Sequence, residues 1–566
     1  MPRIASLLYS CLSALQCIIV SGQVTDDATT SSEALYDYIV AGAGPAGIVV
    51  AQRFAETGAS VLLLERGGPS TFATGGNLTV PWNHTATIYD VPGYGHQLNF
   101  IPSASVAWCS DTPGLAGCIL GGGSVVNGLQ WIKPTTWDFD GFPAGWKWDD
   151  VAPATARVFE RNPGTSLASA DGKYYDQAVY QTLTKQLAPY GWKEVDSTKE
   201  PDAKVKTYNH PADNVLGGLR SGPVRTYLPL AEAKENFKLR LNTKVIRAVR
   251  TNATITGVEV EDASGSREII RLSQGGRVVL SAGAMSTPRL LFNSGIGPAD
   301  QLRVVQQSKT ANVTLPDEAQ WINLPVGKNI QDHPLFRLVW NVTDPGLSKL
   351  TSLSTAQVLN PSAENVALFA KGSGPLVQGS VRMVLWDKMT NQDGSVRYIE
   401  SMSFTRANGT VLIGATLTHG ADSRGELGIH PNGTTYFIKN PLLQTAGDKE
   451  AVSSFFQLLL DYARGPDSVL EFSSRGRNAT VEDMWAGGWD SARHFVGSAK
   501  LGTDDGRQSA GSAVVDVDTK VYGTDNLFVI DASVIPTLPT GNSMAITMVV
   551  AERAVERILA LDKTKQ

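Results

Sequence analysis

The chain has 566 residues, of which 42% are hydrophobic and 18% are charged, and its formal net charge is −5. At about 150 residues per domain, this length suits roughly two to four domains. The composition excludes a largely disordered chain and a polytopic membrane protein, and the slightly acidic balance argues against a nucleic-acid partner.

The first residues predict a secretory signal peptide. A basic start, Met1-Pro2-Arg3, precedes an apolar run over 4–20 and the small residues Ser21 and Gly22. A short apolar run with these flanks is typical of a cleaved signal, and an uncleaved membrane anchor is the alternative. No later window of the sequence is long and apolar enough to span a bilayer. We therefore expect a signal peptide over 1–22 and a protein that is secreted, or held in the secretory lumen, without a membrane partner.

A strand–turn–helix–strand pattern follows the signal. Residues 36–41 are apolar and rich in β-formers, and the turn Gly42-Ala43-Gly44-Pro45-Ala46-Gly47 comes directly after them. Residues 48–58 show helical apolar spacing, and a second apolar strand over 59–64 ends in Glu65.

This pattern predicts a dinucleotide-binding site. In such a motif Gly42 permits the tight turn, Gly44 lets a pyrophosphate approach the backbone, and Gly47 lets the helix pack closely on the strand. The positive end of the helix dipole faces the phosphates. Glu65 would accept hydrogen bonds from the ribose hydroxyls and would disfavour a 2′-phosphate. The motif alone does not choose between NAD and FAD.

The rest of the chain alternates between helical, strand and loop patterns. In chain order it predicts long loops over 69–102, a second glycine-rich element over 117–127, helices within 146–190, strands over 237–250, 253–261 and 276–282, a helix from Pro288, an antiparallel sheet over 316–482, a strand over 526–530 that ends at Asp531, and a closing helix over 544–561.

Strand-and-helix patterns at both ends predict a discontinuous nucleotide-binding domain with an inserted substrate domain. The expected fold class is α/β: a doubly wound, Rossmann-like domain with an α+β substrate domain built on an antiparallel sheet. We expect the nucleotide-binding domain over 35–80, 110–150, 215–310 and 490–564, and the substrate domain over 81–109, 151–214 and 311–489.

Sequons and cysteines agree with a secretory route. Eight Asn-x-Ser/Thr sequons predict N-glycosylation, at Asn77, Asn83, Asn252, Asn312, Asn341, Asn408, Asn432 and Asn478. In an oxidising compartment Cys109 and Cys118 are expected to form a disulfide, and two free buried thiols are the alternative. No Cys or His cluster has zinc-site spacing, so no metal is expected.

Five segments carry longer motifs. They are 42–47 with Glu65, GGGSVVN over 121–127, GAMSTPRLLFNSGIGP over 283–298, LPVGKNIQDHP over 324–334, and the block from His494 to the PTGN sequence over 539–542. Together, and in this order, they resemble the glucose–methanol–choline (GMC) flavin oxidoreductases over nearly the whole chain that follows the signal.

Within that family the chain is similar to the flavin domain of fungal cellobiose dehydrogenases. Two features differ. The signal runs straight into the nucleotide motif, so we expect no built-in haem domain, and Arg493 stands where that pattern has a sugar-contacting Asn.

The resemblance implies an FAD enzyme that oxidises the CH–OH group of a sugar or a secondary-metabolite alcohol by hydride transfer to flavin N5. His494 matches the family's base and Asn542 matches its partner, and ordinary structural roles in a loop and at a helix N-cap are the alternatives. The expected electron acceptor is O2 or a quinone. Two other functions stay open: an FAD-containing, non-redox lyase like the hydroxynitrile lyases, and a catalytically silent secreted flavoprotein.

The resemblance also implies cofactor contacts for Gly123, Ser124, Asn127, Val245 and Asp531. For Asp531 a helix-capping role is the alternative. No His within 117–127 is placed for a covalent link, so we expect non-covalent FAD.

Two further side chains in these motifs receive predictions. His333, in the QDHP segment, is predicted to be a structural turn residue. We hypothesise that Arg493 pairs with an acidic or carbonyl-bearing substrate, because a guanidinium suits planar acceptors. A surface or channel Arg that is unrelated to turnover is the alternative.

Overall fold

The structure is a computed structural model that describes residues 35–101, 106–310, 312–347, 352–406 and 409–563. The predicted signal peptide, 1–22, lies outside the described residues. Among the helices that are described, none combines the length and the hydropathy needed to cross a membrane.

A parallel sheet carries the N-terminal motif. Its strands β1 (Tyr36–Ala41), β2 (Val61–Leu64), β9 (Phe237–Arg240), β12 (Arg267–Leu280) and β22 (Leu527–Val529) lie in the order β22-β12-β1-β2-β9, and each neighbouring pair is parallel. All of β2 and nearly all of β1 are buried. Strands covered on both faces read as continuous apolar runs, which explains their pattern in the sequence.

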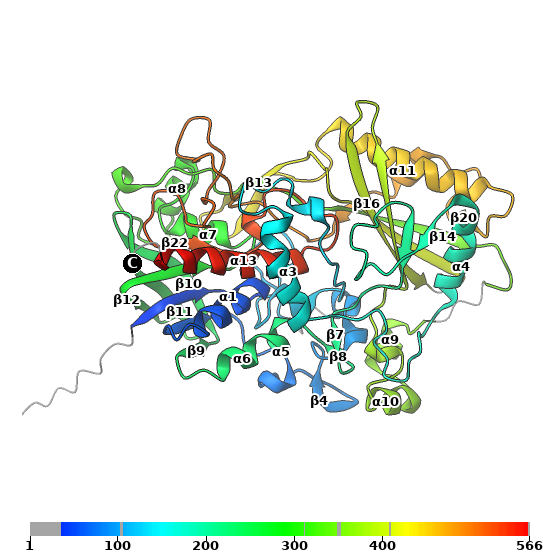
Figure 1. The fold of residues 1–566 in the computed structure, drawn as a ribbon, viewed down its shortest axis with the longest axis horizontal. Coiled ribbons are helices and arrows are strands. Elements are labelled where there is room, and N and C mark those ends of the chain that lie inside the picture. The colour runs from blue at the N-terminus through cyan, green and yellow to red at the C-terminus, as the bar shows by residue number, and fades with distance from the viewer. Residues whose placement is uncertain (1–34, 102–105, 311, 348–351, 407–408, 564–566) are drawn as a thin grey trace, which may run out of the picture. The chain divides into compact units, whose positions relative to one another are not determined.

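β12 is long enough to pair on two sides. Its last residues pair with β1 and β22, while 267–271 pair antiparallel with β11 (Thr254–Asp262), which itself pairs with β10 (Thr243–Thr251). Helices α1 (Pro45–Ala55) and α13 (Met544–Lys563) pack against one another beside this sheet (Figure 1). Elements from both ends of the chain therefore build one layer.

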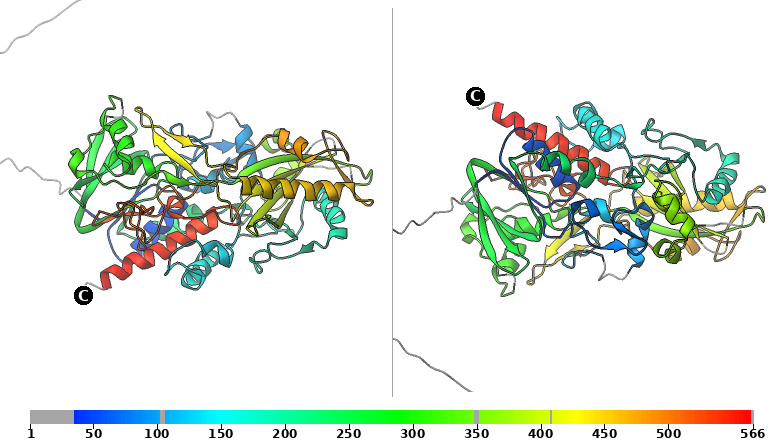
Figure 2. Two further views of the ribbon diagram at one scale, coloured as in Figure 1. Left: turned by 90° about the horizontal axis from the view of Figure 1, so that it is seen from above. Right: turned by 90° about the horizontal axis from the view of Figure 1, so that it is seen from below.

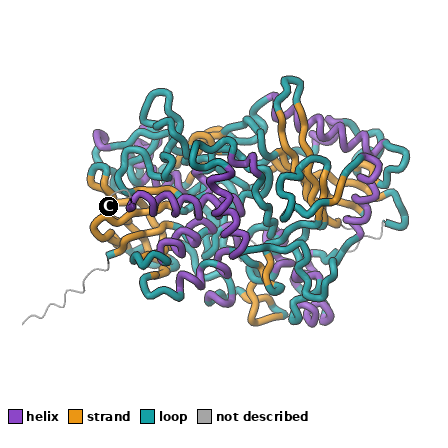
Figure 3. Tube along the Cα trace, in the orientation of Figure 1, coloured by secondary structure: helices purple, strands orange, loops and turns teal. Residues whose placement is uncertain are grey.

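A second sheet is almost entirely antiparallel, with β5–β6 as its parallel pair. Figure 3 shows its strands gathered apart from those of the parallel sheet. Its strands are β5 (Lys193–Glu194), β6 (Thr207–Asn209), β14 (Pro334–Val342), β15 (Met383–Thr390), β16 (Val396–Arg406), β17 (Thr410–Leu417), β20 (Leu470–Phe472) and β21 (Asp490–Ser491). The predicted α/β fold class and the antiparallel sheet within 316–482 are thus confirmed.

One long helix in this region escaped prediction. Helix α11 (Ala446–Arg464) packs along the second sheet (Figure 2). Its buried residues include Ala451, Val452, Phe455 and Phe456, so its core face follows helical spacing.

The remaining elements are shorter or connect the two sheets. They are β3 (Thr79–Val80), β4 (Asn83–Thr87), α2 (Gly123–Val126), α3 (Trp148–Arg161), α4 (Ala178–Leu187), β7 (Val215–Leu216), β8 (Leu219–Arg220), α5 (Pro223–Thr226), α6 (Leu228–Glu232), α7 (Thr287–Asn293), α8 (Ala299–Gln306), β13 (Lys328–Ile330), α9 (Thr355–Leu359), α10 (Ala363–Phe369), β18 (Gly425–Ile429), β19 (Thr435–Lys439) and α12 (Val481–Ala486).

A buried carboxylate on α13 joins the closing helix to its neighbours. The side chain of Glu552 is fully buried, accepts a hydrogen bond from Tyr227 Oη at 2.9 Å, and pairs with Arg53 of α1 and Arg157 of α3, each at 3.0 Å. A buried charge of this kind is tolerated only when it is paired. The predicted domain boundary at residue 151 falls inside α3, which packs on α13.

Candidate active site

A cavity of about 430 Å³ lies at the carboxyl ends of the parallel strands. Gly42 after β1, Glu65 after β2 and Ser281 after β12 line it on one side. On the side nearest the second sheet, the cavity is lined by residues of β14 and by residues 491–495. Open α/β sheets bind their ligands at this edge.

The first glycine turn leaves the start of α1 open. Gly44 is the N-cap and Pro45 follows, so no side chain occupies the N-terminal N–H groups. Gly42 has φ of +110°, and a Cβ there would lie 2.5 Å from the Ser281 oxygen. A Cβ on Gly47 would lie 1.9 Å from the Gly42 oxygen. The turn therefore requires glycine at both positions and presents free N–H groups suited to an anion.

The carboxylate of Glu65 ties the two strand ends together. It accepts hydrogen bonds from the backbone N–H of Ala43 at 2.9 Å and of Gly67 at 2.8 Å. Burial raises the pKa of Glu65, and these two bonds oppose that rise. Glu65 also lines the cavity, where its oxygens can accept further hydrogen bonds.

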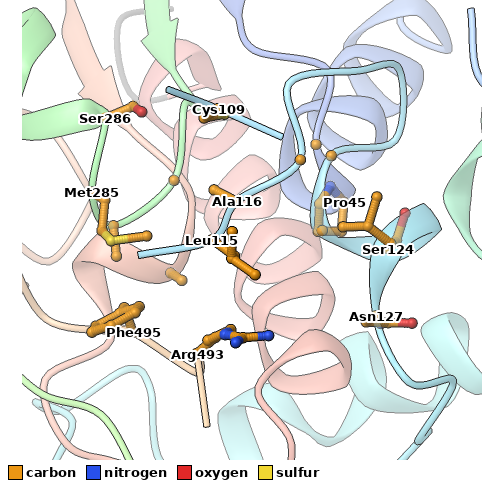
Figure 4. A pocket seen from close by; sticks show the side chains of 18 of the residues that line it. Pro45, Cys109, Leu115, Ala116, Ser124, Asn127, Met285, Ser286, Arg493 and Phe495 are labelled. Carbon is orange, nitrogen blue, oxygen red and sulfur yellow. The ribbon is translucent and has the colours of Figure 1, made fainter. Parts of the chain in front are cut away.

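The second glycine-rich element forms another wall. Ser124 and Asn127 both line the cavity (Figure 4). Two hydrogen bonds fix the Asn127 side-chain amide. Its Oδ1 accepts from Arg220 Nη1 at 2.8 Å and from the Leu129 N–H at 3.1 Å. Arg220 is buried, and sequence analysis assigned it no role.

Asp531 lies where β22 ends and performs a capping role. One oxygen accepts from the Ser533 N–H at 2.7 Å, and the other accepts from the Gly283 N–H at 2.8 Å and from Thr287 Oγ1 at 2.6 Å. The carboxylate thus fixes the Gly283 turn at the cavity wall, and Asp531 lines the cavity itself. Val245 of β10 lines the same cavity.

Three glycines at the cavity wall show whether the cavity has room for a dinucleotide. Gly44, Gly123 and Gly283 line the cavity, and a Cβ built on any of them would meet no protein atom within 4 Å. Their missing side chains therefore leave room for a ligand rather than for neighbouring backbone. With the open helix end and Glu65, this wall supplies what a pyrophosphate and a ribose require.

A larger side chain at Gly44 should block the cofactor without disturbing the fold. Gly44 has φ of −76°, which any residue adopts, and the added atoms of Gly44→Leu would enter the cavity. We expect the affinity for flavin to fall at least about tenfold, with a milder loss for Gly44→Ala. Flavin retained after gel filtration measures this, and thermal melting of the apoprotein controls for folding. Full flavin content in Gly44→Leu would contradict the assignment of this glycine turn to the flavin-binding site.

The predicted disulfide is present. Cys109 and Cys118 are bonded and line the cavity. Among the described residues, they form with Asp111 the one group whose atoms are close enough to hold a metal ion. Both sulfurs are committed to the disulfide, and the Asp111 carboxylate pairs with Arg66 and Arg289, so this group does not offer a free ligand set.

His494 and Asn542 meet at the cavity. His494 Nε2 lies 2.8 Å from Asn542 Nδ2, and both residues line the wall. His494 Nδ1 lies 2.9 Å from His333 Nδ1, and His333 Nε2 lies 3.0 Å from the Pro539 carbonyl oxygen. The four groups form one hydrogen-bonded row.

This row fixes the tautomer of His494. A carbonyl oxygen only accepts, so His333 Nε2 must donate to Pro539. The neutral His333 then has a bare Nδ1, which can only accept, so His494 Nδ1 must donate to it. His494 Nε2 is consequently bare, and the Asn542 amide donates to it. The unprotonated nitrogen of His494 therefore faces the cavity.

Both imidazoles are held in the neutral form. Burial and the adjacent Arg493 charge lower the pKa of His494 to about 4. Burial, with His494 next, lowers the pKa of His333 well below its usual range. A neutral imidazole near pH 7 is able to accept a proton.

Asp332 positions the segment that carries His494. Its Oδ1 accepts from the His494 N–H at 2.7 Å, and its Oδ2 accepts from Ser491 Oγ and from the Arg493 N–H at 3.4 Å. Burial raises the pKa of Asp332 to about 7, although these hydrogen bonds oppose the rise. Arg493 has φ of +67°, an uncommon conformation for a residue with a side chain, and its N–H also donates to Ser491 Oγ at 2.9 Å.

The QDHP segment therefore does more than turn the chain. His333 was predicted to be a structural turn residue, and the structure adds that its ring contacts that of His494 directly. Asp332 was not singled out at all. The signal available in the sequence was the placement of Asp332 and His333 within a recognisable motif just before a strand.

Arg493 also reaches the cavity, where its side chain points inward in Figure 4. Its Nη1 donates to Asn99 Oδ1 at 2.9 Å. His96, to which no role was assigned, lines the cavity nearby.

The described sequons lie at or near the surface. Seven of the eight fall in the described part of the chain, and none of these is buried. Asn77, Asn252, Asn312, Asn432 and Asn478 are exposed, Asn83 and Asn341 are half-buried, and Asn408 lies outside the described residues. Their glycosylation stays a prediction.

Comparison with known proteins agrees with this architecture. The two family models of the GMC oxidoreductases match residues 36–335 and 422–551. A 5-(hydroxymethyl)furfural oxidase of Methylovorus is 25% identical over 93% of this chain and 99% of its own. An oxygen-dependent choline dehydrogenase of Vibrio vulnificus is 27% identical over 93% and 94%. A variant of the Aspergillus oryzae formate oxidase shares the fold, with a TM-score of 0.73 at 20% identity over 94% and 99%. The chain belongs to the GMC oxidoreductase family, whose members depend on FAD.

Proposed function

We propose that this protein is a secreted, N-glycosylated oxidoreductase that oxidises a CH–OH group of a sugar or a secondary-metabolite alcohol, with His494 as the base. The observation that carries the proposal is the row from Pro539 through His333 to His494. It leaves a bare Nε2 beside Asn542, at the wall of a cavity whose glycines make room for a dinucleotide.

FAD, when bound in this cavity, would supply the two-electron chemistry as the acceptor of a hydride from the carbinol carbon. The protein manages the proton. The substrate hydroxyl donates to His494 Nε2, which accepts the proton as the C–H bond breaks. His494 Nδ1 keeps its hydrogen bond to His333, so the imidazolium that forms stays oriented.

Asn542 orients the alcohol oxygen. Its Nδ2 donates to His494 in the present arrangement, and an entering hydroxyl can take over that donor. Asn542 Oδ1 is buried and has no partner among the described residues. An amide fixes the oxygen without adding charge, so it leaves the pKa of His494 low.

Secretion and non-covalent FAD complete the proposal. The disulfide and the accessible sequons support a secretory route. Residues 117–127 contain no His, and the thiol of Cys118 is committed to the disulfide, which supports a non-covalent cofactor.

The names of the relatives support an alcohol as substrate. Hydroxymethylfurfural and choline share a CH–OH group and differ in charge and shape. The acceptor for the electrons is O2 or a quinone.

Anaerobic mixing tests the proposed function. We expect at least one member of a panel of sugars, primary alcohols and hydroxylated metabolites to bleach the flavin absorption, and O2 or a quinone to restore it. A flavin that stays unbleached while the protein cleaves a cyanohydrin would assign a lyase instead. A flavin that no alcohol bleaches, without lyase activity, would leave a silent flavoprotein.

The pH dependence of kcat/KM should report His494. Only the neutral form accepts a proton, and the pKa of His494 is about 4, so activity is present above that pH and is lost as the pH falls through it. Arg493→Gln removes one cause of the low pKa of His494. The fall in kcat/KM on the acid side of the pH profile, the acid limb, should therefore lie at higher pH in this variant than in the wild type. An acid limb near pH 6.5 in the wild type would contradict this assignment.

Asp332 is a second titrating group beside His494, so it provides the control for this assignment. The pKa of its carboxyl is about 7, and the carboxyl accepts a hydrogen bond from the backbone N–H of His494. Asp332→Asn removes the titrating group and keeps a carbonyl acceptor. We expect the acid limb to stay where it is in the wild type.

A further inference from the structure

We propose that Arg493 forms an anion subsite beside His494, and that the substrate is a hydroxy acid whose carboxylate binds there. This inference rests on the proposed function and names its substrate class.

Acidic and basic side chains are distributed unevenly around the cavity wall. Its acidic lining residues are Glu65 and Asp531, and both are bound to the nucleotide-binding turns. Three of its cations, Arg66, Lys244 and Arg289, converge on Asp111. The wall that carries His494 has Arg337 and Arg493 and, among the described residues, no acidic side chain that lines it.

Arg493 is the cation of that wall that forms no ion pair within the described part of the chain, although the charge of Asp490 acts on it from a distance. Arg337 pairs with Asp490 at 3.2 Å. The guanidinium of Arg493 forms no ion pair with the described residues, and its hydrogen bond goes to a neutral amide oxygen, Asn99 Oδ1. Asp332 does not neutralise it by contact, because that carboxyl is bonded to Ser491 and to backbone N–H groups.

The backbone aims this side chain into the cavity. Arg493 adopts a left-handed conformation, in which its N–H donates to Ser491 Oγ at 2.9 Å and to Asp332 Oδ2 at 3.4 Å, while Asp332 Oδ1 accepts from the His494 N–H. Arg493 directly precedes His494, and Figure 4 shows its side chain directed into the cavity that both residues line. The guanidinium is exposed and aimed inward in Figure 4, and it offers further N–H donors in a planar fork that matches a carboxylate.

A bound carboxylate would also strengthen the base. The charge of Arg493 helps to lower the pKa of His494. Pairing that charge with an anion offsets its effect, so His494 becomes a better proton acceptor when this substrate is present.

Matched substrates test the subsite. For 3- and 4-(hydroxymethyl)benzoate we expect a kcat/KM at least about tenfold higher than for their methyl esters, since a hydrogen-bonded charge pair is worth that much. In Arg493→Gln the preference should vanish, because the acids lose their advantage over the esters. Arg493→Lys keeps the charge without the fork and should retain part of the preference. Equal rates on acids and esters in the wild type would overturn the proposal.

A binding measurement separates this proposal from the proposed function. Acetate and benzoate should perturb the flavin absorption of the resting holoenzyme and compete with the alcohol, whereas acetamide and benzamide should not. Arg493→Gln should weaken carboxylate binding at least about tenfold. Carboxylates that bind no better than the amides, or equally well to Arg493→Gln, would overturn the subsite. Esters that bleach the flavin without any acid preference would leave the proposed function standing and remove the subsite. Carboxylate binding in a protein whose flavin no alcohol bleaches would leave the subsite standing and remove the proposed function.

Discussion

Replacing His494 by Gln should slow the anaerobic bleaching of the flavin about 10²- to 10⁴-fold, the largest effect expected of any single substitution here. Glutamine retains polarity and approximate size, but its amide cannot accept a proton at neutral pH. The hydroxyl then has to lose its proton to water while the hydride leaves. Stopped-flow absorbance with saturating alcohol measures the step directly.

Cofactor binding is the control for this variant. The His494 side chain is hydrogen-bonded to His333 and Asn542 and not to the Gly42–Gly47 turn, so flavin content and melting temperature should remain close to those of the wild type. A His494→Gln protein that holds its flavin and bleaches within a few-fold of the wild-type rate would exclude His494 as the base.

Replacing His333 by Leu should have the second-largest effect, about 10²-fold or more on the same rate. Leucine removes the acceptor for His494 Nδ1, so the imidazole can place its proton on Nε2 and present the wrong tautomer to the substrate. In a serine protease, replacing the carboxylate that orients the catalytic imidazole costs about 10⁴ in kcat through the wrong tautomer.

His333→Asn provides the matched rescue. The Oδ1 of asparagine can stand near the position of His333 Nδ1 and accept from His494. We expect this variant to recover most of the rate that His333→Leu loses, at equal flavin content. If His333→Leu and His333→Asn are equally impaired, the ring is needed for packing and not as an acceptor.

The local motifs were the most predictable part of this protein. The strand that ends at Gly42, the turn to Gly47 and the acid at Glu65 are contiguous, so periodicity and glycine placement predict them directly. The disulfide followed from the expected compartment. His494 and Asn542 came from the resemblance, and the structure brings their side chains within 2.8 Å.

The contacts that decide the state of His494 were not predictable from local pattern. His333 and His494 are 161 positions apart, and their rings meet because β14 and the segment after β21 pack side by side. Asp332 acts on backbone N–H groups of that same distant segment. Arg493 adopts a left-handed conformation there, and its N–H donates to the nearby Ser491 Oγ at 2.9 Å and to the distant Asp332 at 3.4 Å. The resemblance could therefore suggest the candidate base but not its tautomer.

The most direct test of the central claim is the rate of anaerobic flavin bleaching with an alcohol that carries deuterium on the carbinol carbon. The account predicts bleaching that is slower with the deuterated alcohol than with the protiated one, because the C–H bond breaks in that step, and a further large loss of rate in His494→Gln. A flavin that neither alcohol bleaches, or a rate indifferent to His494, would contradict it.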